Sequence, residues 1–283
     1  MENEIFDKIR KFLSTKEGEK HLKDNLERVI TELQKLSVRS YARNVIPESL
    51  DCLSPIYRIE TLDNFSMNVK NKTLYFGHPK NWLIGDKLDS IILRKKVILP
   101  DGSIVEQKYF EDTFCQCWSK KQSRKMWEEY GKDKEYKNVA MVSNVDKIMR
   151  TLESPEDILD YSETFWVGEV SYLDFNDDGA NILLKTIADQ MAFFKSKTIA
   201  SCYLEKRSKY DFEDEIRFIA DNCKLDMGKE FSLIPVKNDF KDFLDGIILD
   251  PRLVDSKLKE KISQELQKKG FKIIEGNKDF NRR

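Results

Sequence analysis

The sequence predicts an α+β protein with a mixed, mostly antiparallel sheet core flanked by helices, preceded by an N-terminal helical segment. Three observations support this fold class. Segments with alternating apolar residues and segments with helical spacing follow one another irregularly along the chain. The N-terminal segment shows helical spacing only. A Pro-Asp-Gly turn at 100–102 separates two apolar runs, which is typical of a β-hairpin.

The N-terminal segment is the first predicted element. Its apolar residues recur three or four positions apart, which places them on one face of a helix. Pro47 and Pro55 interrupt this pattern, so we divide the chain into a helical segment at 1–50 and an α+β domain at 51–283. The apolar face can pack on its own domain or on a helix of a protein partner. Its residues are Leu22, Leu26, Val29, Ile30, Leu33 and Leu36.

The α+β domain begins with a short strand at 54–59 that carries Arg58. A hairpin near 88–110 is interpreted as an insertion. Trp127 and Tyr130 are three residues apart, so on a helical turn they share a face. The remaining strands are expected at 73–76, 114–119, 138–142, 166–172, 246–250 and 271–274, and the helices at 61–69, 145–152, 182–195 and 257–269.

The stretch at 210–219 is the predicted central strand. At period two, Phe212, Ile216 and Phe218 fall on one face, and Glu213, Glu215 and Arg217 fall on the other. Two interpretations stay open. Such a face is typical of a solvated edge strand. It can also line a cleft, in which one glutamate is catalytic and the other is held by Arg217.

Composition restricts the classes of partner. The chain has 49 basic and 50 acidic residues, whereas a non-specific nucleic-acid binder usually carries a basic surplus. Nucleic acid is therefore an unlikely partner, and a nucleic-acid-directed effector is the least favoured hypothesis. It would depend on one basic loop that contains Lys120, Lys121, Arg124 and Lys125.

The five cysteines are scattered and neither histidine lies at ligand spacing beside them, so we expect free thiols and no metal site. The sequence contains no apolar run of membrane-spanning length and no signal peptide at its start. We therefore expect a soluble cytoplasmic protein without a membrane partner.

Common enzyme motifs are missing, among them the glycine-rich phosphate loop and the His-Glu-x-x-His zinc motif. A metal-dependent nuclease usually has a lysine after its glutamate, where this chain has Arg217. The remaining candidates, in chain order, are Arg58, Ser119, the Trp127–Tyr130 turn and Glu215.

This order resembles that of the arginine–serine–glutamate mono-ADP-ribosyltransferases. The resemblance implies that Arg58 holds the NAD pyrophosphate, and that Ser119 with the aromatic faces of Trp127 and Tyr130 clamps the nicotinamide ribose. Glu215 would stabilise the oxocarbenium-like state as nicotinamide leaves.

Glu213 would orient the acceptor nucleophile. Arg217 is a further candidate for the cofactor-binding site, where it would pair with Glu213 or a neighbouring carboxylate. The chain departs from the family at the middle motif, where Cys-Trp-Ser-Lys at 117–120 stands in place of Ser-Thr-Ser.

Six pieces between residues 54 and 275 also resemble, in order and spacing, a large bacterial family called domain of unknown function 2971. That resemblance implies a link to phage-defence loci. The pieces are Ile56–Arg58, Leu74–Phe76 with Pro79, Cys117–Ser119 with Met126–Tyr130, Val167–Tyr172, Glu213–Arg217 and Ile247–Pro251.

Two leading hypotheses follow. In the first, the chain is an ADP-ribosyltransferase or NAD glycohydrolase that uses NAD as its substrate and needs no metal. In the second, it is a non-catalytic sensor of a nucleotide ligand, or an interaction module whose N-terminal helices contact a partner.

Overall fold

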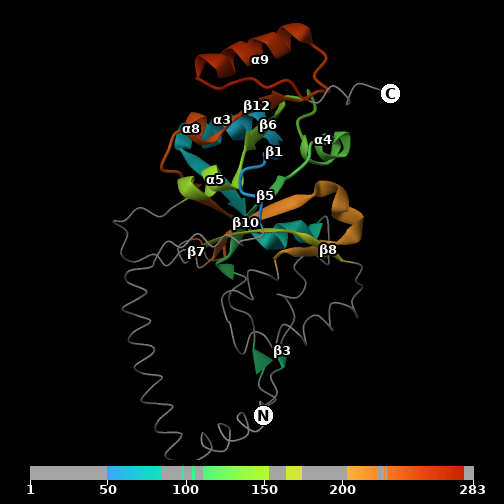
Figure 1. Ribbon diagram of the computed structural model, residues 1–283, viewed down its shortest axis with the longest axis vertical. Coiled ribbons are helices and arrows are strands. Elements are labelled where there is room, and N and C mark those ends of the chain that lie inside the picture. Colours follow the sequence, from blue (N-terminus) through green and yellow to red (C-terminus); the bar gives the residue numbers. More distant parts are fainter. Residues whose placement is uncertain are drawn as a thin grey trace, which may run out of the picture. The chain divides into compact units, whose positions relative to one another are not determined.

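The computed structural model describes residues 50–84, 97–98, 104–105, 111–152, 164–173, 203–221, 223, 226 and 228–276 (Figure 1). The N-terminal helical segment, the predicted helix at 182–195 and most of the predicted hairpin lie outside the described residues. The division of the chain at residue 50 therefore stays a prediction.

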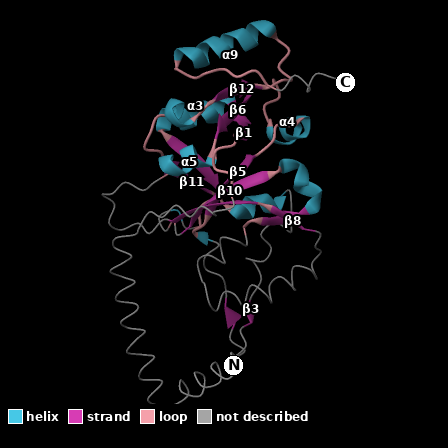
Figure 2. Ribbon diagram, viewed as in Figure 1, coloured by secondary structure: helices cyan, strands magenta, loops and turns pink. Residues whose placement is uncertain are grey.

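An eight-stranded sheet forms the centre of the described part (Figure 2). Its main path runs β11-β2-β5-β1-β6-β12, and β10 joins β5 to β7. All of its strand pairs are antiparallel, which confirms the predicted fold class. The strands are β1 (Ile56–Thr61), β2 (Thr73–Gly77), β5 (Phe114–Ser119), β6 (Asn138–Ser143), β7 (Thr164–Glu169), β10 (Glu215–Asp221), β11 (Phe231–Pro235) and β12 (Gly246–Leu249).

Two small strand pairs are separate from this sheet. In the predicted hairpin, β3 (Val97–Ile98) and β4 (Ile104–Val105) pair antiparallel, while β8 (Ser171–Leu173) and β9 (Glu205–Arg207) pair in parallel. The helices are α3 (Leu62–Asn71), η1 (Pro79–Ile84), α4 (Arg124–Tyr130), α5 (Val145–Thr151), η4 (Ser208–Glu213), α8 (Phe240–Phe243) and α9 (Ser256–Lys268).

Helices cover both faces of β6 and β1. Figure 1 shows α3, α5 and α8 on one side of these strands and α4 on the other. Every residue of β6 is buried, as expected for an apolar strand covered on both faces. The main apolar core includes Phe65 of α3, Ile148 of α5 and Phe240 of α8. A smaller cluster lies under α4 and consists of Trp127, Ala140, Val142 and Ile248.

The sheet divides at β5, and this division positions the site. Along one edge, β5 pairs with β2 only at Gly77–Cys115 and with β1 only at Tyr57–Ser119. Its other edge pairs with β10 along the whole strand. Cys117 lies between the two single pairs. β1 and β2 thus leave β5 in different directions and open a space over its middle.

The predicted central strand is wrong in its extent. Residues 208–213 form the 3-10 helix η4, and Asp214 has a left-handed backbone with φ of 42°. The strand itself begins at Glu215 and is internal, because β10 pairs with both β5 and β7. The end of β5 holds this turn: the Lys120 amide donates to the carbonyl of Asp214, at 2.8 Å. Glu213 and Glu215 therefore belong to different elements.

Two further expectations need correction at the C-terminal side. β11 was not predicted, although it lies beside β2 in the sheet. The predicted strand at 271–274 is reduced to an isolated bridge between Ile273 and Ile247. The predictions of α3, β12 and α9 are confirmed within two residues at each end.

Candidate active site

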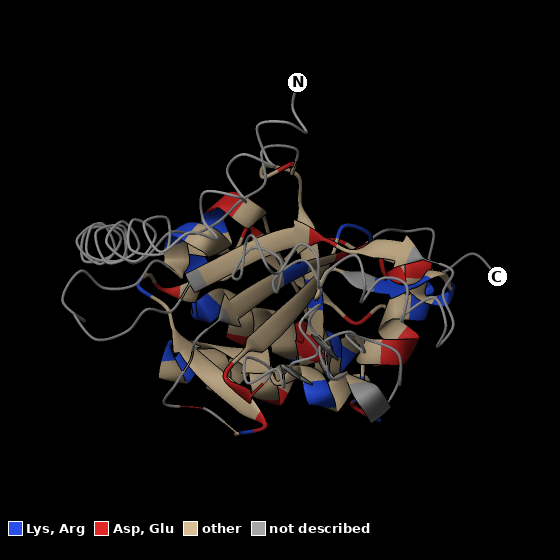
Figure 3. Cartoon of the chain, turned by 90° about the horizontal axis from the view of Figure 1, so that it is seen from below, with Lys and Arg blue, Asp and Glu red and all other residues tan. Residues whose placement is uncertain are grey.

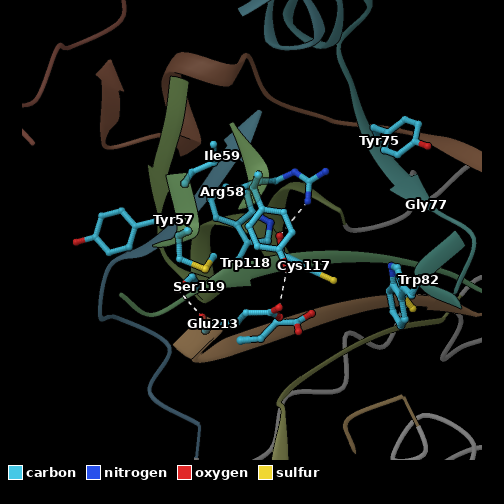
Figure 4. A pocket seen from close by; sticks show the side chains of 14 residues that line it. Tyr57, Arg58, Ile59, Tyr75, Gly77, Trp82, Cys117, Trp118, Ser119 and Glu213 are labelled. Atoms are coloured by element: carbon cyan, nitrogen blue, oxygen red, sulfur yellow. Dashed lines mark hydrogen bonds between the residues drawn. The ribbon is translucent and has the colours of Figure 1, made fainter. Parts of the chain in front are cut away.

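A cavity of about 210 Å³ lies where β1 and β2 separate over β5 (Figure 4). Its walls are mainly aromatic and aliphatic, with one arginine and two glutamates among them. Figure 4 shows the Arg58 side chain reaching toward the backbone of Cys117, with Tyr75 and Trp82 on one side and Tyr57 on the other. The lining residues are Tyr57, Arg58, Ile59, Tyr75, Gly77, Trp82, Cys115, Cys117, Trp118, Ser119, Met126, Tyr130, Glu213 and Glu215.

Glu215 is a buried carboxylate held by two cations. Only 4% of the residue is exposed. Arg217 donates to both carboxylate oxygens, from Nε at 2.7 Å and from Nη2 at 3.2 Å, and Lys206 Nζ lies 3.3 Å from Oε2. Burial by itself would raise the pKa of Glu215, but Arg217 and then Lys206 outweigh it and hold the pKa below its ordinary value. Glu215 is therefore ionised at neutral pH.

Glu213 lies beside Glu215 in a different electrostatic environment. One carboxylate oxygen accepts a hydrogen bond from Tyr130 Oη at 2.7 Å, and the other is bound by Lys206. Burial, together with the neighbouring charge of Glu215, raises the pKa of Glu213 to about 7, although Lys206 opposes this shift. Glu213 can thus exchange a proton near neutral pH while Glu215 stays ionised. Two acidic groups with separated pKa values are typical of acid–base sites.

Arg58 provides the positive charge in the cavity wall. Its Nη1 donates to the carbonyl of Cys117 at 2.9 Å, which fixes the guanidinium across the gap between β1 and β5. Its buried Nε has no hydrogen-bond partner in the described part of the chain. An anionic group of a ligand would satisfy this donor.

A second cavity of about 350 Å³ adjoins the first. The two cavities share four wall residues, so Arg58 stands at their boundary. The shared residues are Arg58, Ile59, Tyr75 and Tyr130, and the second cavity is also lined by Glu60, Thr61, Asn64, Met67, Asn68 and Lys132.

Ser119 lines the cavity, but its hydroxyl is engaged within the protein. It lies 2.6 Å from the carbonyl oxygens of both Lys121 and Glu213, and it accepts from the Lys121 amide at 3.1 Å. A hydroxyl has one hydrogen, so it donates to one of these carbonyls at a time. Ser119 therefore fastens the end of β5 to η4, which carries Glu213.

Trp127 does not line either cavity. It is fully buried between α4 and the strands β6 and β12, where its indole packs against Val142 and Ile248. Trp127 takes the core position of α4, while Met126 and Tyr130 of the same helix line the cavity. Arg217 is also fully buried and does not line the cavity; it contacts Glu215 and places its guanidinium 4.1 Å from the ring centre of Trp82.

Three contacts of the carboxylate pair were not foreseen. Lys206 of β9 bridges Glu213 and Glu215, and no local pattern distinguishes it from other lysines. The Tyr172 hydroxyl accepts a hydrogen bond from the Glu215 amide at 2.9 Å, and Cys117 helps to hold the pKa of Glu215 below its ordinary value. Tyr172 and Cys117 both lie within the pieces that resemble domain of unknown function 2971, so that match was the available signal.

The basic loop after β5 is neutralised locally. Lys120 pairs with Glu169 and Asp214, Lys121 pairs with Asp214 at 2.7 Å, and Arg124 pairs with Glu128 at 2.8 Å. Lys125 Nζ lies 3.6 Å from the ring centre of Phe212. Figure 3 shows acidic and basic residues interspersed over the described elements. This arrangement gives no continuous basic groove along this loop.

The described residues contain no cluster of three or more side chains suited to hold a metal ion. None of the described helices is long and apolar enough to cross a membrane.

Comparisons with known proteins give distant structural similarity. No protein-family model matches the chain, and no curated protein matches it. Among solved structures, it is similar to DarT from Thermus sp. 2.9 in complex with carba-NAD+, at 15% identity and a TM-score of 0.33, over 84% of this chain and 100% of that chain. The complex with ADP-ribosylated ssDNA gives 15% identity and a TM-score of 0.36, over 85% and 100% of the two chains. The complex with NAD+ gives 16% identity and a TM-score of 0.32, over 84% and 100%.

At this identity the similarity assigns no role to any residue of the cavity. The resemblance to domain of unknown function 2971 stays a prediction, because no family model matches.

Proposed function

We propose that the chain binds NAD in the two adjoining cavities and cleaves the bond between nicotinamide and ribose. One observation carries this proposal. Two buried carboxylates, one ionised and one able to exchange a proton near neutral pH, face the same cavity as an arginine. This combination suits the cleavage of an N-glycosidic bond in NAD, because positive charge develops on the sugar while the pyrophosphate is anionic.

The position of Arg58 determines how a dinucleotide would lie. Its guanidinium is at the boundary of the two cavities, where it would bind the central pyrophosphate. The nicotinamide riboside half would then occupy the cavity of about 210 Å³, between the carboxylates and the aromatic rings of Trp82 and Tyr130. The adenosine half would occupy the cavity of about 350 Å³.

The reaction would use the carboxylates in separate roles. As the carbon–nitrogen bond breaks, its electron pair leaves with neutral nicotinamide and positive charge develops on the ribose C1. The ionised Glu215 would stabilise this charge, directly or through the 2′-hydroxyl. A nucleophile would then attack C1 and lose its proton to the ionised form of Glu213, whose pKa near 7 suits a general base. Water as the nucleophile gives a glycohydrolase, and a hydroxyl or amine of an acceptor gives an ADP-ribosyltransferase.

A second function is favoured by a different observation. The charged and hydroxyl groups of the cavity are compensated inside the protein: Glu215 is paired with Arg217 and Lys206, and the Ser119 hydroxyl with backbone carbonyls. Such a site can recognise a nucleotide without turning it over. A non-catalytic nucleotide sensor is therefore the alternative.

Two measurements on the wild-type protein distinguish these functions: NAD binding by calorimetry and release of free nicotinamide. Binding with catalytic release supports the enzyme. Binding with an intact nicotinamide–ribose bond supports the sensor. If the folded protein does not bind NAD, the NAD-cleaving enzyme and a sensor of NAD are both refuted.

A further inference from the structure

Two buried polar side chains lie in the wall of the larger cavity, away from the carboxylate pair. Glu60 follows Arg58 on the same face of β1, two residues further along, which is roughly 7 Å on a strand. Asn68 of α3 lies against it and donates from Nδ2 to Glu60 Oε2 at 3.3 Å. Only 7% of Glu60 and 2% of Asn68 is exposed, and both line the cavity.

Each of these side chains has an acceptor oxygen without a hydrogen-bond partner in the described part of the chain. The atoms are Glu60 Oε1 and Asn68 Oδ1. An acceptor that is buried without a donor destabilises a fold by about 1–3 kcal/mol, so two such oxygens side by side are rare in cores. A neutral ligand group with two N–H bonds could donate to both oxygens.

The charges along this cavity determine the orientation in which a ligand would bind. Arg58 and Lys132 are its cationic wall residues, and Glu60 is its acidic one. A phosphate would therefore lie toward the cations and away from Glu60, where a neutral hydrogen-bond donor is favoured. Tyr75 provides an aromatic ring in the same wall. A nucleotide whose base carries an amino group fits this order of phosphate, ring and donor.

We propose that Glu60 and Asn68 recognise the exocyclic amino group of adenine and make the larger cavity selective for adenine nucleotides. This inference rests on the proposed dinucleotide function and adds the recognition of its base. A purine without the amino group would leave both acceptor oxygens unpaired. The same chemistry would recognise the adenosine half of NAD and free AMP, so both are tested.

The test compares NAD with its analogue in which unsubstituted purine replaces adenine, by calorimetry on the full-length protein. AMP and purine riboside 5′-monophosphate form the second pair of ligands. The variants are Glu60→Met, which keeps the side-chain length and removes both acceptors, and Asp63→Asn, which removes one exposed carboxylate outside both cavities. Glu60→Met should fold, because an apolar side chain of similar size replaces an incompletely paired buried carboxyl group.

Wild type and Asp63→Asn should bind NAD roughly tenfold or more tightly than the purine analogue. In Glu60→Met the preference within each pair should fall several-fold, because Asn68 Oδ1 is then the one proposed acceptor that remains. Equal binding of NAD and its analogue by wild type would overturn adenine recognition and leave the NAD site intact. If NAD fails to bind but AMP is still preferred over purine riboside 5′-monophosphate, the dinucleotide function is wrong and the adenine site stands. Equal or absent binding of that mononucleotide pair, together with no NAD binding, would refute both.

Discussion

At the scale of single residues, the environment shifts the pKa values of two chemically identical side chains in opposite directions. Glu213 and Glu215 are both buried, and both contact Lys206. Of the two carboxylates, Arg217 binds that of Glu215, through both oxygens, and this pairing decides which of the two is ionised. Glu213 instead accepts a hydrogen bond from the neutral hydroxyl of Tyr130. The difference between their partners produces an ionised group and a proton-exchanging group side by side.

The raised pKa of Glu213 predicts a pH dependence of stability. In the unfolded chain Glu213 ionises near its ordinary 4.5, whereas in the fold it keeps its proton up to about pH 7. Between these values the folded state binds more protons, so the free energy of unfolding falls as the pH rises. Glu213→Gln removes this contribution. Between pH 5 and pH 7, its free energy of unfolding should gain about 2 kcal/mol relative to wild type, as measured by urea denaturation. A constant difference would contradict the raised pKa.

Arg217 should be far more important for stability than an exposed arginine. Among the described residues, Arg217→Met leaves the buried Glu215 with Lys206 as its one remaining cation, which should lower the free energy of unfolding by about 3–5 kcal/mol. Arg124→Met breaks an exposed pair with Glu128 and should lower it by less than about 1 kcal/mol. Urea denaturation of the two variants in parallel makes the comparison. Similar losses would show that the Arg217–Glu215 pair has no special role.

Residue order in the sequence predicted part of this site. Arg58, Ser119, Tyr130, Glu213 and Glu215 all line one cavity. Lys206 could not be predicted, because a lone lysine on a short strand gives no periodic signal. The position of Trp127 was also beyond local reasoning. The spacing of Trp127 and Tyr130 gives their relative angle on a helix, but tertiary packing decides which one enters the core.

At the scale of elements, the two incomplete pairings of β5 create the cavity. β1 and β2 each contact one end of this strand, and the Arg58 guanidinium spans the opening to Cys117. The sequence could predict most of these elements, because each has its own apolar pattern, and the N-cap Thr61 marks the start of α3. It could not predict their register, which depends on partners far away in the chain. The left-handed Asp214, which ends η4 before β10, likewise has no clear local signal.

The α4 helix should depend on Trp127 for its attachment and on Tyr130 for its contact with the site. Trp127→Ala empties a fully buried position and should lower the free energy of unfolding by about 3–5 kcal/mol. Tyr130→Phe removes only the hydroxyl that binds Glu213 and should cost about 1 kcal/mol. Urea denaturation of both variants checks this order. If Trp127→Ala were as stable as Tyr130→Phe, the anchoring role of the indole would be refuted.

At the scale of the whole described fold, the charge distribution favours a small anionic ligand over a long nucleic acid. The basic loop after β5 is paired with acidic and aromatic neighbours, while Arg58 stands between two cavities that lie side by side. In the proposed function, Arg58 is the point at which the pyrophosphate would bind. The buried carboxylates lie on one side of that point, and Glu60 with Asn68 on the other.

The rate of nicotinamide release from NAD tests the central claim most directly, with wild type, Glu215→Gln and the exposed control Glu129→Gln measured together. Wild type and Glu129→Gln should release nicotinamide at similar rates, whereas Glu215→Gln should be slower by roughly 100-fold or more, because it lacks the charge that stabilises the transition state. Calorimetry should show that Glu215→Gln still binds NAD. Equal release by wild type and Glu215→Gln would contradict the account.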